Sequence, residues 1–320
     1  MARSEDLRFR AGDASLAATL TVPDGDGRLP WALLVPSWLP RNRDGDWDRS
    51  RHPGWYAPRS TDAPAGLFAR LADALAQHGV ASLRYDPRGC GESDGTWTQA
   101  DLFTRIDDAR DAIGAMRSRR ELDLRRCAIV GHGEGAVVAT SVAIGDPAIG
   151  ALGLLGPSAR SIRDVLRRGA AERSRSGADR EHPAVAALDR SVEELIERAE
   201  RREPSMPLLI GEEVVDLGLA AWDQAFHTPV LALATMLHRN VVIAHGTADA
   251  WSDIDESRLL EATLRDGGNE PVLLEIADAG HDLRGSAMRE FADPLAARIE
   301  SRELPPVLVA IEGMGGNGSA

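Results

Sequence analysis

The sequence predicts an α/β fold in which helices cover both faces of a mostly parallel sheet and a helical cap is inserted between two strands. Two observations support this prediction. Short apolar runs alternate with helical patterns over residues 1–157 and again over 237–312, and strands separated by helices form parallel sheets. Between these two parts of the core, residues 158–236 are rich in arginine and glutamate and have helical periodicity, which indicates the cap.

Short apolar or alternating segments that end at turn residues mark the expected strands. They are residues 15–22, 31–35, 80–85, 127–130, 149–155, 241–244 and 272–276, with an ambiguous strand at 207–210 in the cap. Apolar residues at helical spacing predict helices at 67–78, 101–117, 136–144, 191–202, 254–264 and 287–299. The glycine- and serine-rich residues 313–320 are expected to form a disordered tail.

The composition is typical of a soluble globular protein. Of 320 residues, 43% are hydrophobic and 27% are charged, which supplies enough apolar material for a core. The most apolar window, residues 136–155, is interrupted by Asp146, Pro147 and several glycines, so it predicts a helix and a buried strand and not a membrane span. Because there are only two cysteines and no apolar stretch in the N-terminal residues, we expect a cytoplasmic protein.

Every basic residue is an arginine, because the sequence contains no lysine. This excludes Schiff-base, pyridoxal-phosphate and Walker-lysine chemistry. The net charge of −13, without a basic stripe, argues against nucleic acid as a partner. A small-molecule substrate, no cofactor and no metal are expected, and the sequence leaves a homodimer open.

Three strand ends carry residues of interest, and in parallel sheets the chemistry lies at the carboxyl ends of the strands. Residues 131–135 (Gly-His-Gly-Glu-Gly) follow the strand at 127–130 and precede a helix, which is the setting of a nucleophile elbow. Flanking glycines let strand and helix approach closely, and the helix N-terminus offers N–H groups to an anion. The apex residue, which is Ser, Cys or Asp in a working elbow, is Gly133.

The other two strand ends present an acid and a base. The strand at 241–244 leads to Asp249, and the strand at 272–276 leads to His281, 32 residues after the acid. A lone acidic residue after a strand is usually a helix cap or a turn former. Elbow, acid and histidine in this order, each at a strand end, form a more specific pattern.

With these motifs and with residues 83–93 (Leu-Arg-Tyr-Asp-Pro-Arg-Gly-Cys-Gly-Glu-Ser), the sequence resembles the α/β-hydrolase fold superfamily over nearly its whole length. It is most similar to the bacterial esterase and acyl-thioesterase branch that has a helical cap after the sixth strand. The resemblance implies a triad of the elbow nucleophile, Asp249 and His281. It also implies an oxyanion hole formed by the N–H of Glu134 and one from the loop after residues 31–35, where Ser37 and Trp38 lie.

Two features depart from this family. Gly133 has no side chain that can attack a substrate. The oxyanion loop, which is His-Gly followed by small residues in that branch, is here residues 36–40 (Pro-Ser-Trp-Leu-Pro), where proline cannot donate an N–H and Trp38 adds bulk. One engineered substitution would explain the first departure but not the second. Together they favour natural divergence.

The remaining acid and histidine lead to the favoured hypothesis. Asp249 would orient His281 as a general base that takes a proton from a carbon acid, a hydroxyl or a water, for isomerisation, cyclisation, elimination or water-mediated hydrolysis, as in a biosynthetic pathway. The first alternative is a serine esterase or thioesterase with an inactivating serine-to-glycine substitution at position 133. The second is a non-catalytic protein that only binds a small molecule, although such a protein has no evident need for both Asp249 and His281.

Three residues are candidates for substrate binding: His132, Trp222 and Phe226. For each of them, packing in the core is the simpler interpretation. Ser37 is a candidate for a relocated hydroxyl, and an acid role for Glu134 stays open because no serine lies beside it.

The charged segment 42–55, which contains two tryptophans, is either a lid or a solvated loop. Arg41, Arg43 and Arg88 would pair either with a substrate carboxylate or with Asp44 and Asp46, and the sequence does not decide between these partners.

Overall fold

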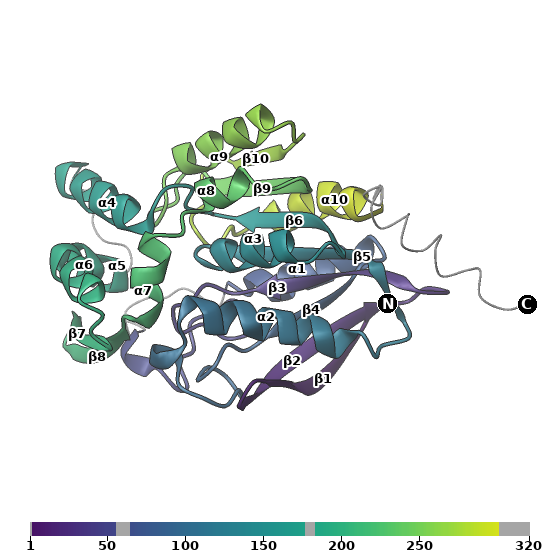
Figure 1. The fold of residues 1–320 in the computed structure, drawn as a ribbon, viewed down its shortest axis with the longest axis horizontal. Coiled ribbons are helices and arrows are strands. Elements are labelled where there is room, and N and C mark those ends of the chain that lie inside the picture. The colour runs from purple at the N-terminus through teal and green to yellow at the C-terminus, as the bar shows by residue number, and fades with distance from the viewer. Residues whose placement is uncertain (1, 56–64, 177–182, 301–320) are drawn as a thin grey trace, which may run out of the picture.

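The core of the protein is an eight-stranded sheet in a computed structural model that describes residues 2–55, 65–176 and 183–300 (Figure 1). In spatial order the strands are β1 (Ala2–Ala11), β2 (Ala14–Pro23), β4 (Ala81–Tyr85), β3 (Leu29–Val35), β5 (Leu122–His132), β6 (Ile149–Leu155), β9 (Asn240–Gly246) and β10 (Val272–Ile276). Neighbours from β4 to β10 are parallel, whereas β1–β2 and β2–β4 are antiparallel. The predicted mostly parallel sheet is confirmed, and the expected tail at 313–320 lies outside the described residues.

Strand β1 was not predicted by the sequence analysis. It pairs with β2 along its whole length, from Ala2 opposite Pro23 to Ala11 opposite Ala14. Most of its side chains are exposed or half-buried, because it forms the edge of the sheet, so it lacks a buried apolar run. The two strands are joined by Gly12 and Asp13, and the positive φ of Gly12 (53°) suits a tight hairpin turn.

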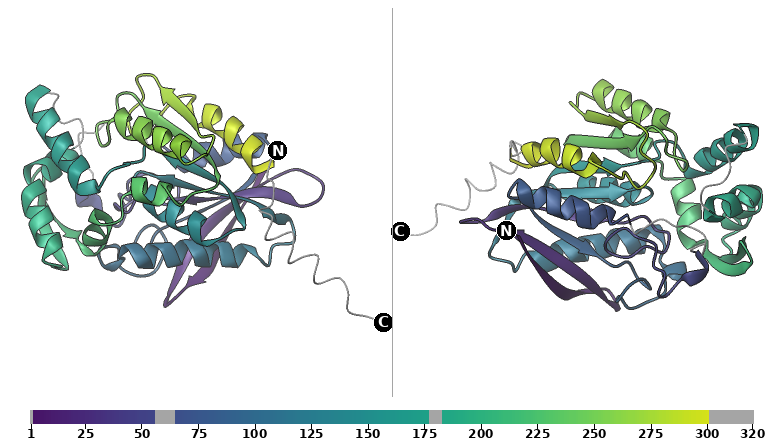
Figure 2. Two further views of the ribbon diagram at one scale, coloured as in Figure 1. Left: turned by 45° about the horizontal axis from the view of Figure 1, so that its top comes forward. Right: turned by 180° about the vertical axis from the view of Figure 1, so that it is seen from behind.

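Helices cover both faces of the sheet, as predicted (Figures 1 and 2). One face packs against α1 (Leu67–Gln77) and α10 (Ala287–Glu300), and the other against α2 (Leu102–Met116), α3 (Gly135–Gly145) and α9 (Ile254–Asp266). Strand β3 is buried along its entire length. Its residues alternate between the two cores, with Leu33 on the side of α2 and α3 and Leu34 on the side of α1.

The inserted segment between β6 and β9 contains a β-hairpin as well as helices. The helices are α4 (Ile162–Ser176), α5 (Pro183–Arg190), α6 (Val192–Glu200), α7 (Ala220–Phe226) and α8 (Val230–Ala234), and the hairpin is β7 (Ser205–Ile210) with β8 (Glu213–Gly218). The ambiguous strand at 207–210 is part of β7, whereas β8 was not predicted. Strand β8 (Glu-Val-Val-Asp-Leu-Gly) mixes polar and apolar residues, and its pairing with β7 is what defines it.

The segment that contains α4–α7 and the hairpin, which we call the cap, lies beyond the carboxyl ends of the parallel strands (Figures 1 and 2). A fully buried carboxylate, Glu256 of α9, holds it there. Glu256 accepts hydrogen bonds from the backbone N–H groups of Ala159 and Arg160, at 3.1 and 2.9 Å, and from the side chains of Arg160 and Arg168. One buried acid thus ties the start of the cap to the core.

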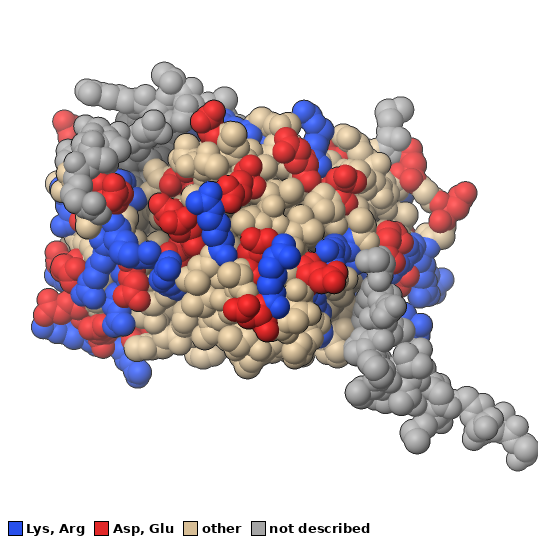
Figure 3. All heavy atoms as spheres, turned by 90° about the horizontal axis from the view of Figure 1, so that it is seen from above, with Lys and Arg blue, Asp and Glu red and all other residues tan. Residues whose placement is uncertain are grey.

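Arginine and acidic side chains alternate on the face shown in Figure 3, and neither sign forms a broad field there. Ion pairs of this kind lie on the exposed side of α9, where Arg258 bridges to Asp255 and Glu275 and Arg265 to Glu261. Among the described residues, none of the helices combines the length and apolar character that a membrane span requires.

Candidate active site

The sharp turn between β5 and α3 is built from glycines that no larger residue can replace without displacing backbone. A Cβ atom on Gly131 would lie 2.3 Å from the carbonyl oxygen of Gly135, and one on Gly135 would lie 2.6 Å from the carbonyl oxygen of Val35. Gly133, at the apex, has a φ of +54°. This close approach of strand, helix and loop is the geometry of a nucleophile elbow, as the sequence pattern predicts.

Asp249 and His281 come together from the loops that follow β9 and β10. Nδ1 of His281 lies 2.8 Å from Oδ2 of Asp249. The other carboxylate oxygen of Asp249 accepts the backbone N–H groups of Trp251 and Ser252, at 2.7 and 3.1 Å. With its carboxylate fixed on both sides, Asp249 orients the imidazole ring of His281.

Both side chains are almost fully buried, and each shifts the pKa of the other. Burial alone would raise the pKa of the Asp249 carboxyl, but the imidazoles of His281 and His245 outweigh it and hold that pKa below its usual range. Burial disfavours the imidazolium of His281, but the Asp249 carboxylate outweighs this, so the pKa of His281 is raised above its ordinary value. The pair therefore stabilises a protonated His281.

The free nitrogen of His281 faces the elbow apex. A Cβ atom on Gly133 would lie 3.0 Å from Nε2 of His281 and 3.7 Å from Cβ of Ser37. Gly156, which directly follows β6, was missed by the sequence analysis. A Cβ atom there would lie 3.1 Å from Nδ1 of His281 and 3.2 Å from Oδ2 of Asp249, so Gly156 leaves room for the pair. The signal in the sequence was a glycine at the end of a predicted strand.

The loop after β3 places Ser37 and Trp38 beside the elbow. The Ser37 hydroxyl donates a hydrogen bond of 2.5 Å to Oε2 of Glu134, and both Ser37 and Trp38 are buried. Within the described residues, the backbone N–H groups of Trp38 and Glu134 have no hydrogen-bond partner, nor does the indole N–H of Trp38. A cavity of about 10 Å³, roughly the least that can hold one water molecule, is lined by Trp38 and Glu134 and also by Tyr85, Arg105 and Asp108; Gly133 and His281 are not among its lining residues.

The three candidates for substrate binding are buried. Trp222 and Phe226 lie on one side of α7, and the Trp222 ring is 5.7 Å from that of Trp38, so α7 packs against the oxyanion loop. His132, at the end of β5, lies with its ring 4.4 Å from that of His281 and donates Nε2–H to the carbonyl oxygen of His281 at 3.1 Å. Burial, followed by the nearby charges of His281 and Arg41, lowers the pKa of His132 to about 3.

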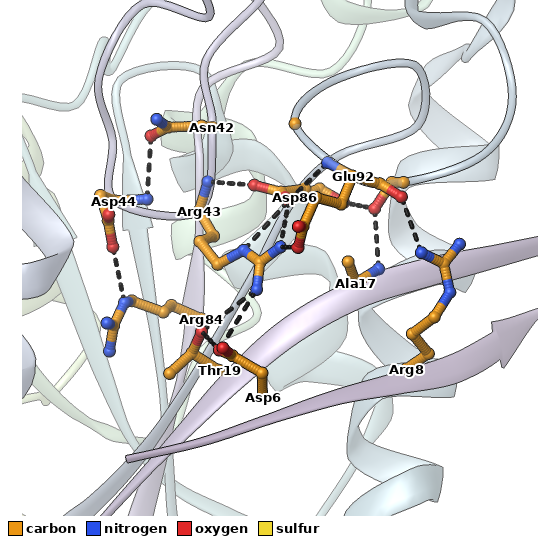
Figure 4. Close-up of polar contacts among 12 residues, drawn as sticks. Asp6, Arg8, Ala17, Thr19, Asn42, Arg43, Asp44, Arg84, Asp86 and Glu92 are labelled. Atoms are coloured by element: carbon orange, nitrogen blue, oxygen red, sulfur yellow. Dashed lines mark hydrogen bonds and ion pairs between the residues drawn. The ribbon is translucent and has the colours of Figure 1, made fainter.

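The segment 42–55 is tied to the core by its own carboxylates and arginines. Figure 4 shows Arg43 on Asp86, with distances of 2.7 and 3.0 Å to Oδ2, and Arg84 on Asp44, at 2.7 Å. These residues line a polar surface groove of about 490 Å³. At the end of the segment, the rings of Trp47 and Trp55 stack 6.1 Å apart. Hydrogen bonds and ion pairs therefore hold this segment against β4 and the residue that follows it.

The arginines whose partners the sequence left open are all paired with acids of the protein. Arg41 contacts Asp282, Arg43 contacts Asp86, and Arg88 contacts Asp108. None of these partners is Asp44 or Asp46. Arg41 is the one that reaches the loop of His281.

Two other polar residues near the strand ends, Ser93 and His245, have structural partners. Ser93 donates to the carbonyl of Asp86 at 2.7 Å, as expected for a turn residue. His245 contacts Oγ of Ser257 at 2.6 Å and the carbonyl of Ser252 at 2.8 Å, and its Nε2 is 3.4 Å from Oδ2 of Asp249. It lies behind the acid, away from the apex.

One group of potential metal ligands lies away from this site. Ligand atoms of Asp48, His52 and Cys90 are within 4.8 Å of one another. The Asp48 oxygens already accept the backbone N–H groups of Arg51 and Gly91, and burial raises the pKa of the Cys90 thiol to about 12. These atoms are thus engaged or protonated.

The sequence matches a known family, and the fold is similar to that of several solved structures. Residues 63–283 match the family model described as serine aminopeptidase, S33. Similar solved structures include Est1E from Butyrivibrio proteoclasticus with bound ferulic acid (17% identity, TM-score 0.65, covering 91% of this chain and 99% of that chain). Others are a complex of DcsB with its substrate analogue (15%, TM-score 0.64, 94% and 100%) and the hypothetical protein PA2218 from Pseudomonas aeruginosa (16%, TM-score 0.63, 94% of both chains).

No curated protein gives a significant match to the sequence. The structural neighbours are less than a fifth identical and share the fold of this chain. The matched family model covers well over half of the chain. The protein therefore belongs to the serine aminopeptidase S33 family of α/β-hydrolase enzymes.

Proposed function

We propose that this enzyme acts on a small organic substrate without a serine nucleophile, and that His281, oriented by Asp249, is its general base. The observation that supports this proposal is the position of Nε2 of His281 at the apex of the elbow, 3.0 Å from where a Cβ atom of residue 133 would lie. With glycine at the apex, a substrate atom or a water in place of the missing side chain would give its proton to this nitrogen.

The proton transfer follows from the hydrogen bonds of the dyad. Nδ1–H of His281 donates to Asp249, so Nε2 carries the lone pair and accepts the proton. For a carbon acid, the electron pair of the broken C–H bond is delocalised onto the adjacent carbonyl oxygen as an enolate. For a hydroxyl or a water, the pair of the broken O–H bond stays on that oxygen, which attacks a carbonyl carbon, and the π electrons of the carbonyl move to its oxygen. Asp249 stabilises the imidazolium that forms. A base placed in this way contributes a rate factor of about 10²–10⁴.

The developing oxyanion would bind to unpartnered N–H groups beside the apex. The backbone N–H of Glu134 lies at the N-terminus of α3, where the helix dipole favours negative charge. The backbone N–H of Trp38 belongs to the loop that faces it. Together these groups would stabilise an enolate or a tetrahedral intermediate. This chemistry covers isomerisation, cyclisation, elimination and attack by an activated water.

Ser37 has a different role in this proposal. Its hydroxyl donates to Glu134, and no hydrogen bond joins it to His281 within the described residues. A nucleophilic serine needs its base within hydrogen-bond reach. We therefore assign Ser37 and Glu134 to the wall of the site, where the carboxylate keeps the hydroxyl in place.

The test uses proton exchange as well as product formation. The parent chain would be incubated in D₂O with aryl esters, including methyl ferulate, and with acyl, β-keto and 2-enoyl thioesters, and followed by NMR. We expect deuterium incorporation or hydrolysis for at least one substrate, reduced about 10²–10⁴-fold in His281→Asn and Asp249→Asn. His238→Asn, an exposed histidine, is the matched control and should keep the parent rate. Parent-like turnover by His281→Asn would contradict the proposal.

A second candidate is a serine hydrolase in which glycine occupies the nucleophile position. Membership of a serine-hydrolase family and the intact pair of Asp249 and His281 favour it. If the parent binds panel members by calorimetry and transforms none of them, the base mechanism is wrong. A binding role is then favoured, unless a serine at position 133 restores hydrolysis.

A further inference from the structure

The loop that carries His281 is held by side chains from three separate elements. Three consecutive carbonyl groups accept hydrogen bonds: that of His281 from Nε2–H of His132 at 3.1 Å, and those of Asp282 and Leu283 from the guanidinium of Arg70, each at 3.0 Å. The loop also includes non-glycine residues with positive φ, among them Leu283 at 44°. Such a conformation persists where surrounding contacts determine it.

The fourth contact is an ion pair from the loop after β3. Nη1 of Arg41 lies 2.9 Å from Oδ1 of Asp282, and it also donates to the carbonyl of Gly45 at 2.7 Å. The Arg41 side chain is only 4% exposed, and its guanidinium carbon lies 4.7 Å from the centre of the Trp47 ring. Because it is buried and packed on an aromatic face, this guanidinium has a fixed position.

We propose that Arg41 is a positioning residue for the reaction: through Asp282 it holds the loop that aims Nε2 of His281 at the elbow apex. This inference rests on the proposed role of His281 as the base. It assigns a function to Arg41, which directly precedes segment 42–55 and whose partner the sequence left open. The orientation of His281 would then depend on Arg41 and Asp282, which lie 241 positions apart in the chain.

The charges of the ion pair also act on His281, with opposite signs. Arg41 disfavours the imidazolium and Asp282 favours it. The other titratable groups around the ring are Asp249 on Nδ1, His132 packed against the ring, and Glu134 at the elbow. His245 acts from behind Asp249. Removing the Arg41 charge should therefore raise the pKa of His281, and removing the Asp282 charge should lower it.

The experiment compares Arg41→Gln, Asp282→Asn and the double variant with the parent. The His281 imidazole is titrated by NMR, and activity is measured on the panel substrate. We expect the titration midpoint to rise by about 0.5 pH unit in Arg41→Gln and to fall by a similar amount in Asp282→Asn. The double variant should lie near the parent. In all three variants, kcat should fall about tenfold with little change in KM, because the orientation of His281 is lost while substrate binding is kept.

Arg43→Gln is the matched control, since Arg43 is also a largely buried arginine of this region, with its side chain 12% exposed, but pairs with Asp86, away from the loop of His281. It should leave the titration of His281 and kcat unchanged. Circular dichroism and thermal unfolding of each variant identify any that fail to fold. Shifts of equal sign in Arg41→Gln and Asp282→Asn, or none, would overturn the proposal. The NMR readout needs no substrate, so it separates this outcome from a failure of the proposed function.

Discussion

Gly133 and His281 approach so closely that the imidazole lies against the position of a side chain at the elbow apex, with 3.0 Å between Nε2 and a Cβ atom on residue 133. Real Cβ atoms rarely come this close to a neighbour, so the ring would have to move by a few tenths of an ångström to admit a serine. The φ of +54° at this position adds strain for any residue other than glycine.

Gly133→Ser should therefore be less stable than the parent by about 1–2 kcal/mol, and Gly133→Ala by a similar amount. Both can be measured by denaturant unfolding. Of the two, only the serine variant should react with a fluorophosphonate probe and release a nitrophenol from aryl esters, because Nε2 of His281 is in place to activate the hydroxyl. Labelling of the alanine variant would show that the probe reacts elsewhere. A stable but inert serine variant would show that the oxyanion loop at 36–40 no longer supports hydrolysis.

The flanking glycines should be far less tolerant than the apex. A Cβ atom on Gly131 would meet backbone atoms of Gly135 and Ala136 at 2.3–2.7 Å, and neither backbone can move without shifting β5 or α3. We expect Gly131→Ala to lower the free energy of unfolding by about 3 kcal/mol or more. Gly114→Ala is the control, because a Cβ atom there meets nothing within 4 Å in α2. That variant should gain about 0.5–1 kcal/mol.

His132 should make the protein sensitive to mild acid. Its pKa of about 3 in the folded protein lies below the value of about 6.5 in an unfolded chain. Between these values the unfolded state binds a proton that the native state does not, so stability falls as the pH decreases, by about 1.4 kcal/mol per pH unit. His132→Asn should flatten this slope between about pH 6 and 4.5. Chemical denaturation at several pH values tests it, and parallel slopes for the two proteins would refute the assignment.

Asp249→Asn should change the titration of His281 and the activity together. The carboxylate raises the pKa of His281, so its removal should lower that pKa and move the acidic limb of the pH–rate profile to lower pH. The rate itself should fall, because the asparagine no longer stabilises the imidazolium. The Asp249 contribution to stability is present above its unfolded pKa of about 3.9 and is lost as the pH falls through the lower folded value. An unchanged His281 titration in this variant would contradict the pairing.

Glu256→Gln should loosen the attachment of the cap. The carboxylate is fully buried and accepts two backbone and two guanidinium donors, and the amide cannot accept all of them. We expect a loss of about 2–4 kcal/mol in the free energy of unfolding and faster proteolysis within 160–176. Glu261→Gln, on the exposed side of the same helix, should have little effect. Equal protease resistance of the two variants would show that other contacts hold the cap.

Much of the fold could be predicted because the buried strands carry their own signal. Strand β6 has the predicted bounds, Ile149–Leu155, since it is a continuous apolar run between two helices. Edge strand β1 and hairpin strand β8 were missed for one reason: both are half-exposed and polar, and they become strands by pairing with a neighbour. The local sequence pattern does not indicate which neighbouring strand will pair with such a segment.

At the site, the elbow, Asp249 and His281 could be found because each follows a strand at a position that parallel topology brings to one edge. The ion pair of Arg41 and Asp282 could not be predicted, since its members lie 241 residues apart and many acids compete for each arginine. Gly156 shows the opposite case. The sequence shows that Gly156 follows a strand. It does not show that the loops of Asp249 and His281 pack against this residue, which is why a glycine is needed there.

The charged edge strand β1 bears on how copies of the chain can associate. A strand at the edge of a sheet offers unpaired N–H and C=O groups to another molecule, which is a common route to fibrils and to continuous sheets across a dimer. Five of the ten residues of β1 are charged: Arg3, Glu5, Asp6, Arg8 and Arg10. Pairing a second copy here would bring these charges close together and remove water from them, so the charged residues disfavour association through this edge.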